Sequence, residues 1–295
     1  MNGILLVNKE KEYTSHDVVA IVKKLTGEKV GHTGTLDPNA TGVLPLLVGK
    51  ATLISKYLIN HDKVYIATLK LGTKTDTADG EGKVLEQVDI KSLNISKEKV
   101  ENVLKDTIGK QEQYPPMYSA IKVNGKKLYD YARKGQEVEI KPRTIEIYDC
   151  KLIDYNKQET EIVFEISCSK GTYIRTVCEN VAEKLNTIGY MKELKRIQVG
   201  EFNIKNAYIL NELKNNNELI EEKLISIEKI FKDKENIILN NKQLELFLNG
   251  VQLKVDKKDE IYKVYTNNNF IGLGIINAKR LRRDVIIWHF LKSVL

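Results

Sequence analysis

Asp37 is the side chain whose setting in this sequence most favours chemistry. It is the one carboxylate in residues 31–45, a stretch with three glycines, two prolines and three threonines that cannot form a regular helix. Because Pro38 pushes the residue before it toward an extended backbone, Asp37 projects from a stiff turn. A carboxylate held in this way can act as a nucleophile or general base when a cation keeps it ionised. The same features also describe an ordinary loop.

Three other side chains could complete a site around this carboxylate. Arg175 follows a Gly-Thr-Tyr turn, and an arginine could pair with Asp37 because its guanidinium stays charged. Tyr65 and His32 offer an aromatic face and a titratable ring. Each has a structural alternative: a surface arginine at a helix start, a core aromatic residue and a loop histidine with local hydrogen bonds. Sequence spacing alone does not show that these positions meet.

Two familiar phosphate motifs fail on inspection. Gly49-Lys50 resembles the end of a P-loop, but Ala51 stands where a magnesium-binding Ser or Thr is needed. Residues 33–36 resemble part of the loop of aspartyl-phosphate enzymes, but Gly31 stands where their nucleophilic Asp would be. There is also no HExxH motif and no nucleophile elbow, and the four histidines have no metal-ligand spacing.

The composition describes a globular protein with a basic surface. The 295 residues carry a net charge of +7 and a sequence pI of about 9.0, which favours a polyanionic partner. Cys150, Cys168 and Cys178 are odd in number and widely spaced, which predicts reduced, structural thiols. No apolar stretch approaches the ~20 residues that cross a bilayer, and no signal peptide is recognisable. We therefore expect a soluble, cytoplasmic protein.

Local patterns predict the elements that would position these residues. Thr14 and Gly27 frame a helix as its N-terminal cap and its stop. Further helices are predicted over residues 50–59, over residues 96–108 and from the turn before Arg175 onward. Apolar or β-branched runs predict strands over residues 3–8, 43–48, 63–71, 144–155, 159–169 and 190–202.

Residues 122–143 form a notably basic segment, with seven Lys and Arg residues, three acidic residues and two tyrosines, Tyr129 and Tyr131. Interleaved basic and aromatic residues suit a surface that follows a nucleic-acid backbone and stacks bases. A solvated helix followed by a hairpin is the alternative. Residues 210–235 indicate a helical connector, and a small unit of one helix and several short strands begins near residue 237.

Several motifs together resemble the TruB family of tRNA pseudouridine synthases. Residues 31–45 match the family's catalytic loop almost residue for residue, and residues 116–129 match a mobile RNA-gripping insertion. The resemblance covers most of residues 1–200, and the C-terminal part is similar to the small PUA-type RNA-binding domain of such enzymes. The other matching motifs are Asp62-Lys63-Val64-Tyr65, the run from Ser169 to Arg175, and Leu194-Lys195-Arg196.

The resemblance implies that the protein isomerises uridine 55 in the T loop of tRNA to pseudouridine, without a cofactor or metal. Asp37 would be the essential carboxylate, either attacking C1′ of the ribose or removing the C2′ proton. Arg175 would pair with Asp37. Tyr65 would stack on the flipped uracil, because an aromatic face offsets part of the cost of extruding a base.

The resemblance also implies roles for three further residues. Tyr173 and Leu194 would line the uracil pocket, and His32 would fill the space that flipped bases leave. The chain departs from the family where Lys9 is followed by charged residues instead of Pro, and where Leu53 replaces a common Lys. Neither departure touches the expected catalytic carboxylate.

We therefore expect an α/β (α+β) architecture with a mixed, largely antiparallel sheet flanked by helices. The catalytic domain would span residues 1–234, with the RNA-gripping insertion at about 110–143, and a PUA-like domain would span residues 235–295. The expected partner is the T-arm stem-loop of tRNA, with no membrane and no obligate protein partner. A non-catalytic tRNA-binding or folding factor is the main rival, since it would not need Asp37; a phosphotransferase is more remote.

Overall fold

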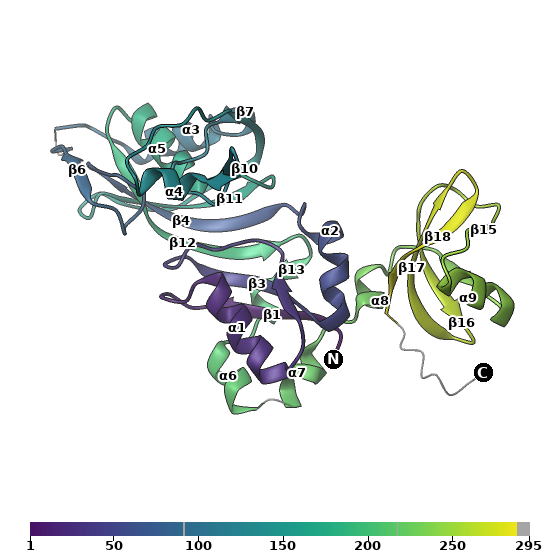
Figure 1. Cartoon of the computed structure of the whole chain (residues 1–295). Helices are drawn as coiled ribbons and strands as arrows, with labels where there is room; N and C mark the ends of the chain where they lie inside the picture. Colours follow the sequence, from purple (N-terminus) through teal and green to yellow (C-terminus); the bar gives the residue numbers. More distant parts are fainter. Residues whose placement is uncertain (91, 217, 288–295) are drawn as a thin grey trace.

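The computed structural model describes residues 1–90, 92–216 and 218–287. Within these ranges the chain forms a large, mostly antiparallel sheet flanked by helices and a second, smaller sheet near the C-terminus (Figure 1), which confirms the predicted class. The strands of the large sheet are β1 (Gly3–Lys9), β2 (Val30–His32), β3 (Thr41–Val48), β4 (Lys63–Leu71), β7 (Gly109–Gln113), β10 (Arg143–Asn156), β11 (Glu161–Cys168), β12 (Gly189–Val199) and β13 (Phe202–Asn203).

The strand order places the Asp37 loop at a junction in this sheet. The order is β1-β3-β12-β4-β11-β10-β7, with β2 paired to β3 and β13 paired to β12. The β3–β12 pair is parallel, at Thr41 opposite Lys195 and Gly42 opposite Arg196, and the other described pairs in this sheet are antiparallel. Because β3 begins at Thr41, the loop before it emerges where β3 meets β12.

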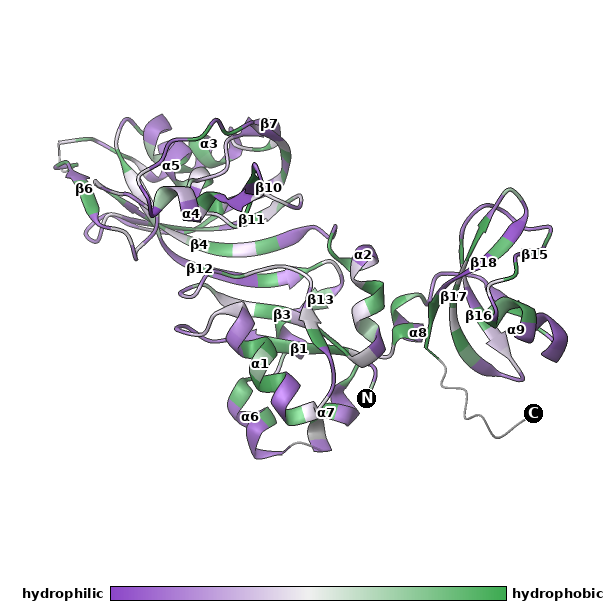
Figure 2. Ribbon diagram, viewed as in Figure 1, coloured by the Kyte–Doolittle hydropathy of each residue, from purple (hydrophilic) through white to green (hydrophobic). Residues whose placement is uncertain are grey.

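The helices cover both faces of the large sheet and extend to the second sheet. Hydrophobic residues follow the strands of both sheets, and the loops are mostly hydrophilic (Figure 2). The helices are α1 (Ser15–Thr26), α2 (Ser55–Leu58), α3 (Lys97–Lys105), α4 (Leu128–Ala132), α5 (Ile174–Lys184), α6 (Leu210–Asn215), α7 (Glu218–Lys223), α8 (Ile227–Ile230) and α9 (Asn241–Leu248), with 3₁₀ turns over Gly49–Ile54 and Ile204–Asn206.

Three apolar clusters hold the large sheet. One packs α1 and α6 on β1 and β3 through residues such as Val18 and Leu210. Another packs α3 and α5 on β4, β10 and β11. In β4 the side chains alternate between buried and half-buried, so Lys63 and Tyr65 point to the same face as the core residues Ala67 and Leu69. That alternation places Lys63 and Tyr65 near the start of β4, on the face that carries the core.

The second sheet is joined to the large one through α2 and α8, which lie between them (Figure 1). Its strands, in the order β14-β16-β17-β18-β15, are β14 (Asn236–Ile238), β15 (Leu253–Lys254), β16 (Ile261–Thr266), β17 (Asn269–Asn277) and β18 (Arg280–Ile286). Leu273 and Val285 join the third apolar cluster, together with Ile4 and Leu6 of β1. The Tyr57 hydroxyl and the Lys56 ammonium both donate to the Asp284 carboxylate. The two sheets therefore contribute to one apolar cluster, with α2 bridging them.

Most of the predicted elements are confirmed. Thr14 caps α1 with a reciprocal Thr14–Asp17 capping box, and Gly27 ends the helix in the left-handed region. The helix predicted over residues 50–59 is wrong in its first half, because the chain makes a tight 3₁₀ turn in which the Thr52 hydroxyl donates to the Gly49 carbonyl oxygen (2.9 Å). The helix capped by Ser96 ends at Lys105, three residues before the predicted end.

The basic segment differs from the alternative weighed for it, a solvated helix followed by a hairpin. The hairpin comes first, as β8 (Lys122–Val123) and β9 (Lys126–Lys127), and the short α4 follows. Asn124 and Gly125 both have positive φ, which suits the turn of a two-residue hairpin. A second hairpin, β5 (Thr73–Thr75) and β6 (Val84–Gln87), brackets a polar turn that contributes to the site described next.

Candidate active site

Asp37 lies in the loop between β2 and β3, and Ser15 at the start of α1 holds this loop. The buried Ser15 hydroxyl donates to the Leu36 carbonyl oxygen (3.0 Å) and accepts from the Leu36 N–H (2.8 Å). The loop closes on itself where the Ala40 N–H donates to the Asp37 carbonyl oxygen (3.1 Å). The Asp37 side chain is 43% exposed, so its backbone is fixed while its carboxylate faces open space.

Lys9, the last residue of β1, is a second anchor for this loop. Its side chain is fully buried, and Nζ donates to the carbonyl oxygens of Pro38 (2.7 Å), Tyr13 (2.6 Å) and Glu10 (3.0 Å). The charged segment after β1 is thereby tied to the residue that follows Asp37. Burial, partly offset by the negative charge of Asp37, lowers the pKa of Lys9 to about 8.

Replacing Lys9 with Met should change how stability depends on pH. The folded protein releases the Lys9 proton near pH 8, but an unfolded lysine keeps it until about pH 10.5, so the unfolded state binds more protons between these values. The free energy of unfolding of the wild type should therefore rise through this window, relative to the variant, by up to about 1.4 kcal/mol per pH unit. Urea unfolding of both proteins across the window measures the difference, and parallel curves would contradict it.

Arg175, the second residue of α5, lies against Asp37. Its side chain is only 6% exposed, and Nη2 is 3.4 Å from Oδ2 of Asp37. The same Nη2 donates to the Tyr118 carbonyl oxygen (2.9 Å), and Nη1 donates to the Thr77 carbonyl oxygen (3.2 Å) and pairs with Asp79 (3.3 Å). The fold thus brings Asp37 and Arg175 together, and several contacts fix the guanidinium in one orientation.

Asp79 is a member of this cluster that sequence analysis did not identify. It lies in the turn between β5 and β6 and is 14% exposed. Its Oδ1 accepts from the Thr77 hydroxyl (2.6 Å) and the Glu81 N–H (3.1 Å), while its Oδ2 faces Arg175. Arg175 is therefore shared by two carboxylates. Asp79 stands 96 residues before Arg175 in a polar turn, so no local pattern marks it.

A small cavity of about 110 Å³ opens beside the Asp37–Arg175 pair. Gln113 fixes one wall, because its side-chain amide donates to the Tyr173 carbonyl oxygen (3.1 Å) and accepts from the Tyr173 N–H (2.8 Å). Met191 of β12 also lines it. Five residues that the sequence predicts for the site line this cavity: Asp37, Tyr65, Tyr173, Arg175 and Leu194.

His32 is not among the residues that line this cavity. It ends β2, opposite Leu46 of β3. Its Nδ1 is buried and has no hydrogen-bond partner among the described residues. Burial and the positive charge of Arg196 lower the pKa of its ring. The fold therefore places His32 outside the small cavity, at the end of the strand that leads into the Asp37 loop.

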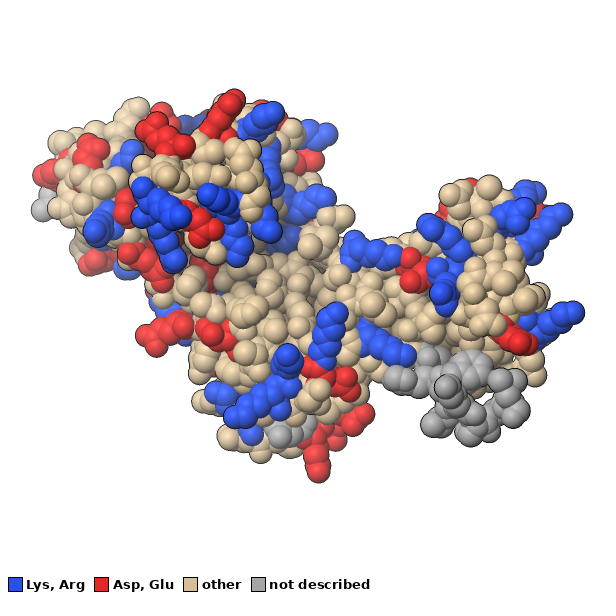
Figure 3. All heavy atoms as spheres, viewed as in Figure 1, with Lys and Arg blue, Asp and Glu red and all other residues tan. Residues whose placement is uncertain are grey.

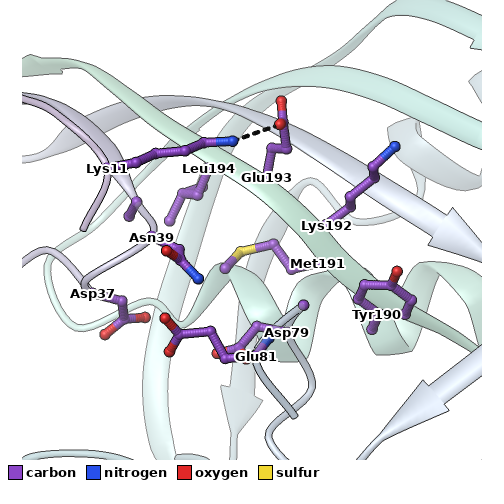
Figure 4. A pocket seen from close by; sticks show the side chains of 12 residues that line it. Lys11, Asp37, Asn39, Asp79, Glu81, Tyr190, Met191, Lys192, Glu193 and Leu194 are labelled. Atoms are coloured by element: carbon purple, nitrogen blue, oxygen red, sulfur yellow. Dashed lines mark hydrogen bonds and ion pairs between the residues drawn. The ribbon is translucent and has the colours of Figure 1, made fainter. Parts of the chain in front are cut away.

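Asp37 also lines two further cavities, so it stands where three meet. One, of about 360 Å³, is bordered by Asp79, Glu81 and the Lys11–Glu193 ion pair (2.8 Å). Figure 4 shows the carboxylates of Asp37 and Glu81 turned toward the same space. The other, of about 630 Å³, has basic walls that carry Lys63, Arg143, Lys170, Arg175 and Arg196.

Three features bear on the expectations about metals, thiols and membranes. Among residues 1–90, 92–216 and 218–287, no group of three or more His, Cys, Asp and Glu side chains is arranged to hold a metal ion, and no helix is long and apolar enough to span a membrane. All three cysteines are free and buried, and burial raises the pKa of Cys150 to about 11 and that of Cys168 to about 12.

Two solved structures share the fold of this chain. A chain of an H/ACA RNP bound to a substrate RNA containing 2′-deoxyuridine superimposes with a TM-score of 0.68, covering 97% of this chain and 85% of that chain at 21% identity. A chain of a Cbf5-Nop10-Gar1 complex gives a TM-score of 0.67, covering 92% and 78% at 23% identity. At these identities the likeness shows the fold alone.

Sequence comparisons define the family. Residues 22–174 match the model of the TruB family pseudouridylate synthase N-terminal domain, and residues 175–237 match that of the tRNA pseudouridylate synthase B C-terminal domain. The tRNA pseudouridine synthase B of Clostridium novyi is 41% identical over 97% of this chain and 100% of its own length, and that of Clostridium tetani is 44% identical over 93% and 95%. The chain belongs to the TruB family of pseudouridylate synthases and is an isomerase.

Proposed function

We propose that this enzyme isomerises uridine 55 in the T loop of tRNA, with Asp37 as its essential carboxylate. The observation that carries the proposal is the position of Asp37, which is paired with a buried arginine where three cavities meet. The name shared by its relatives, tRNA pseudouridine synthase B, supports tRNA as the substrate. A tRNA substrate also suits the excess positive charge and a cytoplasmic location.

The chemistry requires the bond from ribose C1′ to N1 of uracil to break and a bond from C1′ to C5 to form, while C5 gives up its hydrogen and N1 takes up a proton. Asp37 acts on the ribose, at C1′ as a nucleophile or at the C2′ hydrogen as a base. Arg175 orients the carboxylate, because its guanidinium is itself held by backbone carbonyls. Tyr65, Tyr173 and Leu194 enclose the uracil while it turns over in the small cavity.

A uridine inside a folded T loop must leave its stack to reach this cavity. Extrusion costs a few kcal/mol, and stacking on an aromatic side chain returns roughly 1–3 kcal/mol per base. Tyr65 supplies that face at the cavity wall. His32, at the end of β2, would meet the space left by displaced bases only if the RNA enters from the β2 side.

The basic surfaces would hold the phosphates of the T arm. Figure 3 shows Lys and Arg side chains on the lobe that carries α4, interspersed with Asp and Glu, and again on the C-terminal sheet. The insertion at about 110–143 and the PUA-like unit of residues 235–295 would grip the RNA from these two sides. Arg280 and Arg282 are exposed on β18, where they could contact phosphates without reading the sequence.

Substituting basic side chains that line the cavity of about 630 Å³ should reduce the salt dependence of RNA binding. Arg143 and Lys170 are both exposed and line this cavity. Each phosphate contact that is lost should lower the slope of log affinity against log salt by about one, so Arg143→Gln combined with Lys170→Gln should lower it by about two. Fluorescence anisotropy of a labelled T-arm hairpin at several salt concentrations gives the slope.

A matched control for that experiment is Lys157→Gln. Lys157 lies in the turn between β10 and β11, at the end of the hairpin away from Arg143, because Asn156 pairs with Glu161 there. This variant should keep the wild-type slope. A wild-type affinity that does not change with salt would contradict the role given to the basic surfaces.

The proposed function is tested with RNA hairpins that differ in one position. A T-arm hairpin with uridine at position 55 should acquire pseudouridine there, and a hairpin with cytidine at that position should acquire none. An anticodon hairpin of equal length controls for general activity on RNA. Chemical labelling of pseudouridine, nuclease digestion and mass spectrometry locate the product. Equal conversion of uridine in the T-arm hairpin and in the anticodon hairpin would contradict T-loop selectivity.

A further inference from the structure

Lys11 is an exposed lysine that lines the cavity of about 360 Å³, and the roles assigned so far do not use it. Its ammonium donates to Oε1 of Glu193 (2.8 Å), and the two side chains are 55% and 53% exposed. Figure 4 shows this pair across one side of the cavity, with Asp79 and Glu81 on the other. An ion pair between two exposed side chains contributes little to stability, so Lys11 can exchange this partner at little cost.

The backbone of Lys11 is held close to the Asp37 loop. Lys11 and Glu12 form the turn after β1, and Nζ of the buried Lys9 donates to a carbonyl oxygen on each side of that turn (3.0 and 2.6 Å). The same Nζ donates to the carbonyl oxygen of Pro38, the residue after Asp37 (2.7 Å). Glu12 has a left-handed φ of 71°, which glycine adopts more readily, so these contacts hold the turn in a costly conformation. The fold therefore keeps Lys11 at the cavity that Asp37 also lines.

The charges on the walls of this cavity show what Lys11 offers to a ligand. Among the described residues that line it, Lys11 and Lys192 are the cations, and the carboxylates are Asp37, Asp79, Glu81 and Glu193. The ammonium of Lys192 pairs with Glu161, which does not line the cavity (2.6 Å). The carboxylates repel a polyanion unless a cation meets its charge. Because Lys192 is engaged away from the cavity, Lys11 is the side chain placed to meet a phosphate there.

The position of the cavity favours RNA as its occupant. It continues from the small cavity, since Asp37, Met191 and Leu194 line both. A flipped nucleotide is joined to its strand on the 5′ side and on the 3′ side, and the two larger cavities both open at Asp37. One side of the strand can therefore occupy the basic cavity of about 630 Å³, and the other side the cavity at Lys11.

We propose that Lys11 binds a phosphate that flanks uridine 55, and that it exchanges Glu193 for this phosphate when the RNA enters the cavity. A phosphate oxygen accepts the same charge-assisted hydrogen bond that the Glu193 carboxylate accepts in the free protein, and the contact releases counterions from the RNA. This proposal rests on the proposed function, since it takes uridine 55 to be the flipped nucleotide. The alternative is a structural ion pair, in which Lys11 and Glu193 only join the turn after β1 to β12.

Two single variants separate these roles by the sign of their effects. Lys11→Gln should weaken affinity for a T-arm hairpin about fivefold and lower the slope of log affinity against log salt by about one. Glu193→Gln should strengthen affinity about twofold, because it removes the competitor for Lys11 and a carboxylate that repels the RNA. Lys151→Gln, which removes an exposed lysine of β10 that pairs with Asp149, should keep the wild-type affinity. Weaker binding by both Lys11→Gln and Glu193→Gln, or no change in either, would overturn the proposal.

Hairpins with one neutral methylphosphonate linkage, on the 5′ or on the 3′ side of uridine 55, test which phosphate Lys11 contacts. On one of these two hairpins Lys11→Gln should weaken affinity by no more than about 1.5-fold, because that RNA has already lost the charge. A fivefold loss on both, as on the unmodified hairpin, would place Lys11 at another phosphate and overturn the proposal. Fluorescence anisotropy measures these affinities separately from conversion, so wild-type protein that binds the unmodified hairpin without isomerising it would instead disprove the proposed function.

Discussion

The Asp37→Asn variant should bind a T-arm hairpin as tightly as the wild type while its single-turnover rate falls by about 10⁴-fold or more. An amide has the shape of the carboxylate but is neither a nucleophile nor a base at neutral pH. The loop should stay in place, because Ser15 and Lys9 hold it through the backbone atoms of Leu36 and Pro38. The loss should therefore be chemical, with an unchanged melting temperature.

A matched control is Asp154→Asn, which removes an exposed carboxylate from the far part of β10 and should leave the rate unchanged. Quench-flow or hand-mixed assays with enzyme in excess over RNA measure the rate, and anisotropy measures affinity. A variant at Asp37 that retains comparable turnover would show that this carboxylate is not essential. Loss of rate and affinity together would instead assign Asp37 to RNA binding.

The Arg175→Met variant should lose about 10³-fold in single-turnover rate, with a change in RNA affinity of less than about threefold. Arg175 is 6% exposed and makes its contacts within the protein, so the RNA loses no phosphate contact when it is removed. Without it, Asp37 loses the group that orients its carboxylate. Asp79, which is 14% exposed, is left without its cation, so the melting temperature should also fall.

Arg175→Lys separates charge from geometry. A lysine restores a positive charge but not the paired donors that reach the carbonyl oxygens of Thr77 and Tyr118, so it should recover only part of the rate. Asp79→Asn should restore stability to Arg175→Met, since it removes the unpaired charge. An effect of Arg175→Met confined to RNA affinity would contradict the orienting role.

Elements with local signals could be predicted from the sequence. The cap at Thr14 and the glycine at residue 27 set the ends of α1, and the run of β-branched and aromatic residues set β4 at its observed bounds. Helix type was harder to predict over residues 50–59, because the side chain of Thr52 stabilises a tight turn that periodicity does not distinguish from an α-helix.

The parts of the site that depend on long-range contacts could not be predicted in this way. The family resemblance pointed to Asp37, Tyr65 and Arg175 as site residues. The fold brings all three to one cavity. Asp79 lacked such a signal, and Arg196 belonged to the matching Leu194-Lys195-Arg196 motif without being given a role of its own. Arg196 lies on a strand whose register against β4 shifts on both sides of it, which interrupts the simple alternation of inward and outward residues.

Lys9 illustrates the same limit. From sequence, a lysine followed by charged residues at the end of a strand reads as solvated, and burial of its ammonium depends on carbonyl oxygens from Tyr13 and Pro38. Only the packed structure supplies these acceptors. Buried polar groups of this kind are costly when unsatisfied, so their partners become visible only once the fold is known.

Release of the C5 hydrogen tests the central claim most directly, because C5 of uracil gives up its hydrogen when it bonds to C1′. A T-arm hairpin that carries tritium at C5 of its uridines should release one tritium per RNA with the wild-type enzyme. It should release none with Asp37→Asn in the same time, and none when cytidine replaces the uridine at position 55. Equal release by the wild type and by Asp37→Asn, or release by the wild type from the cytidine hairpin, would contradict the account.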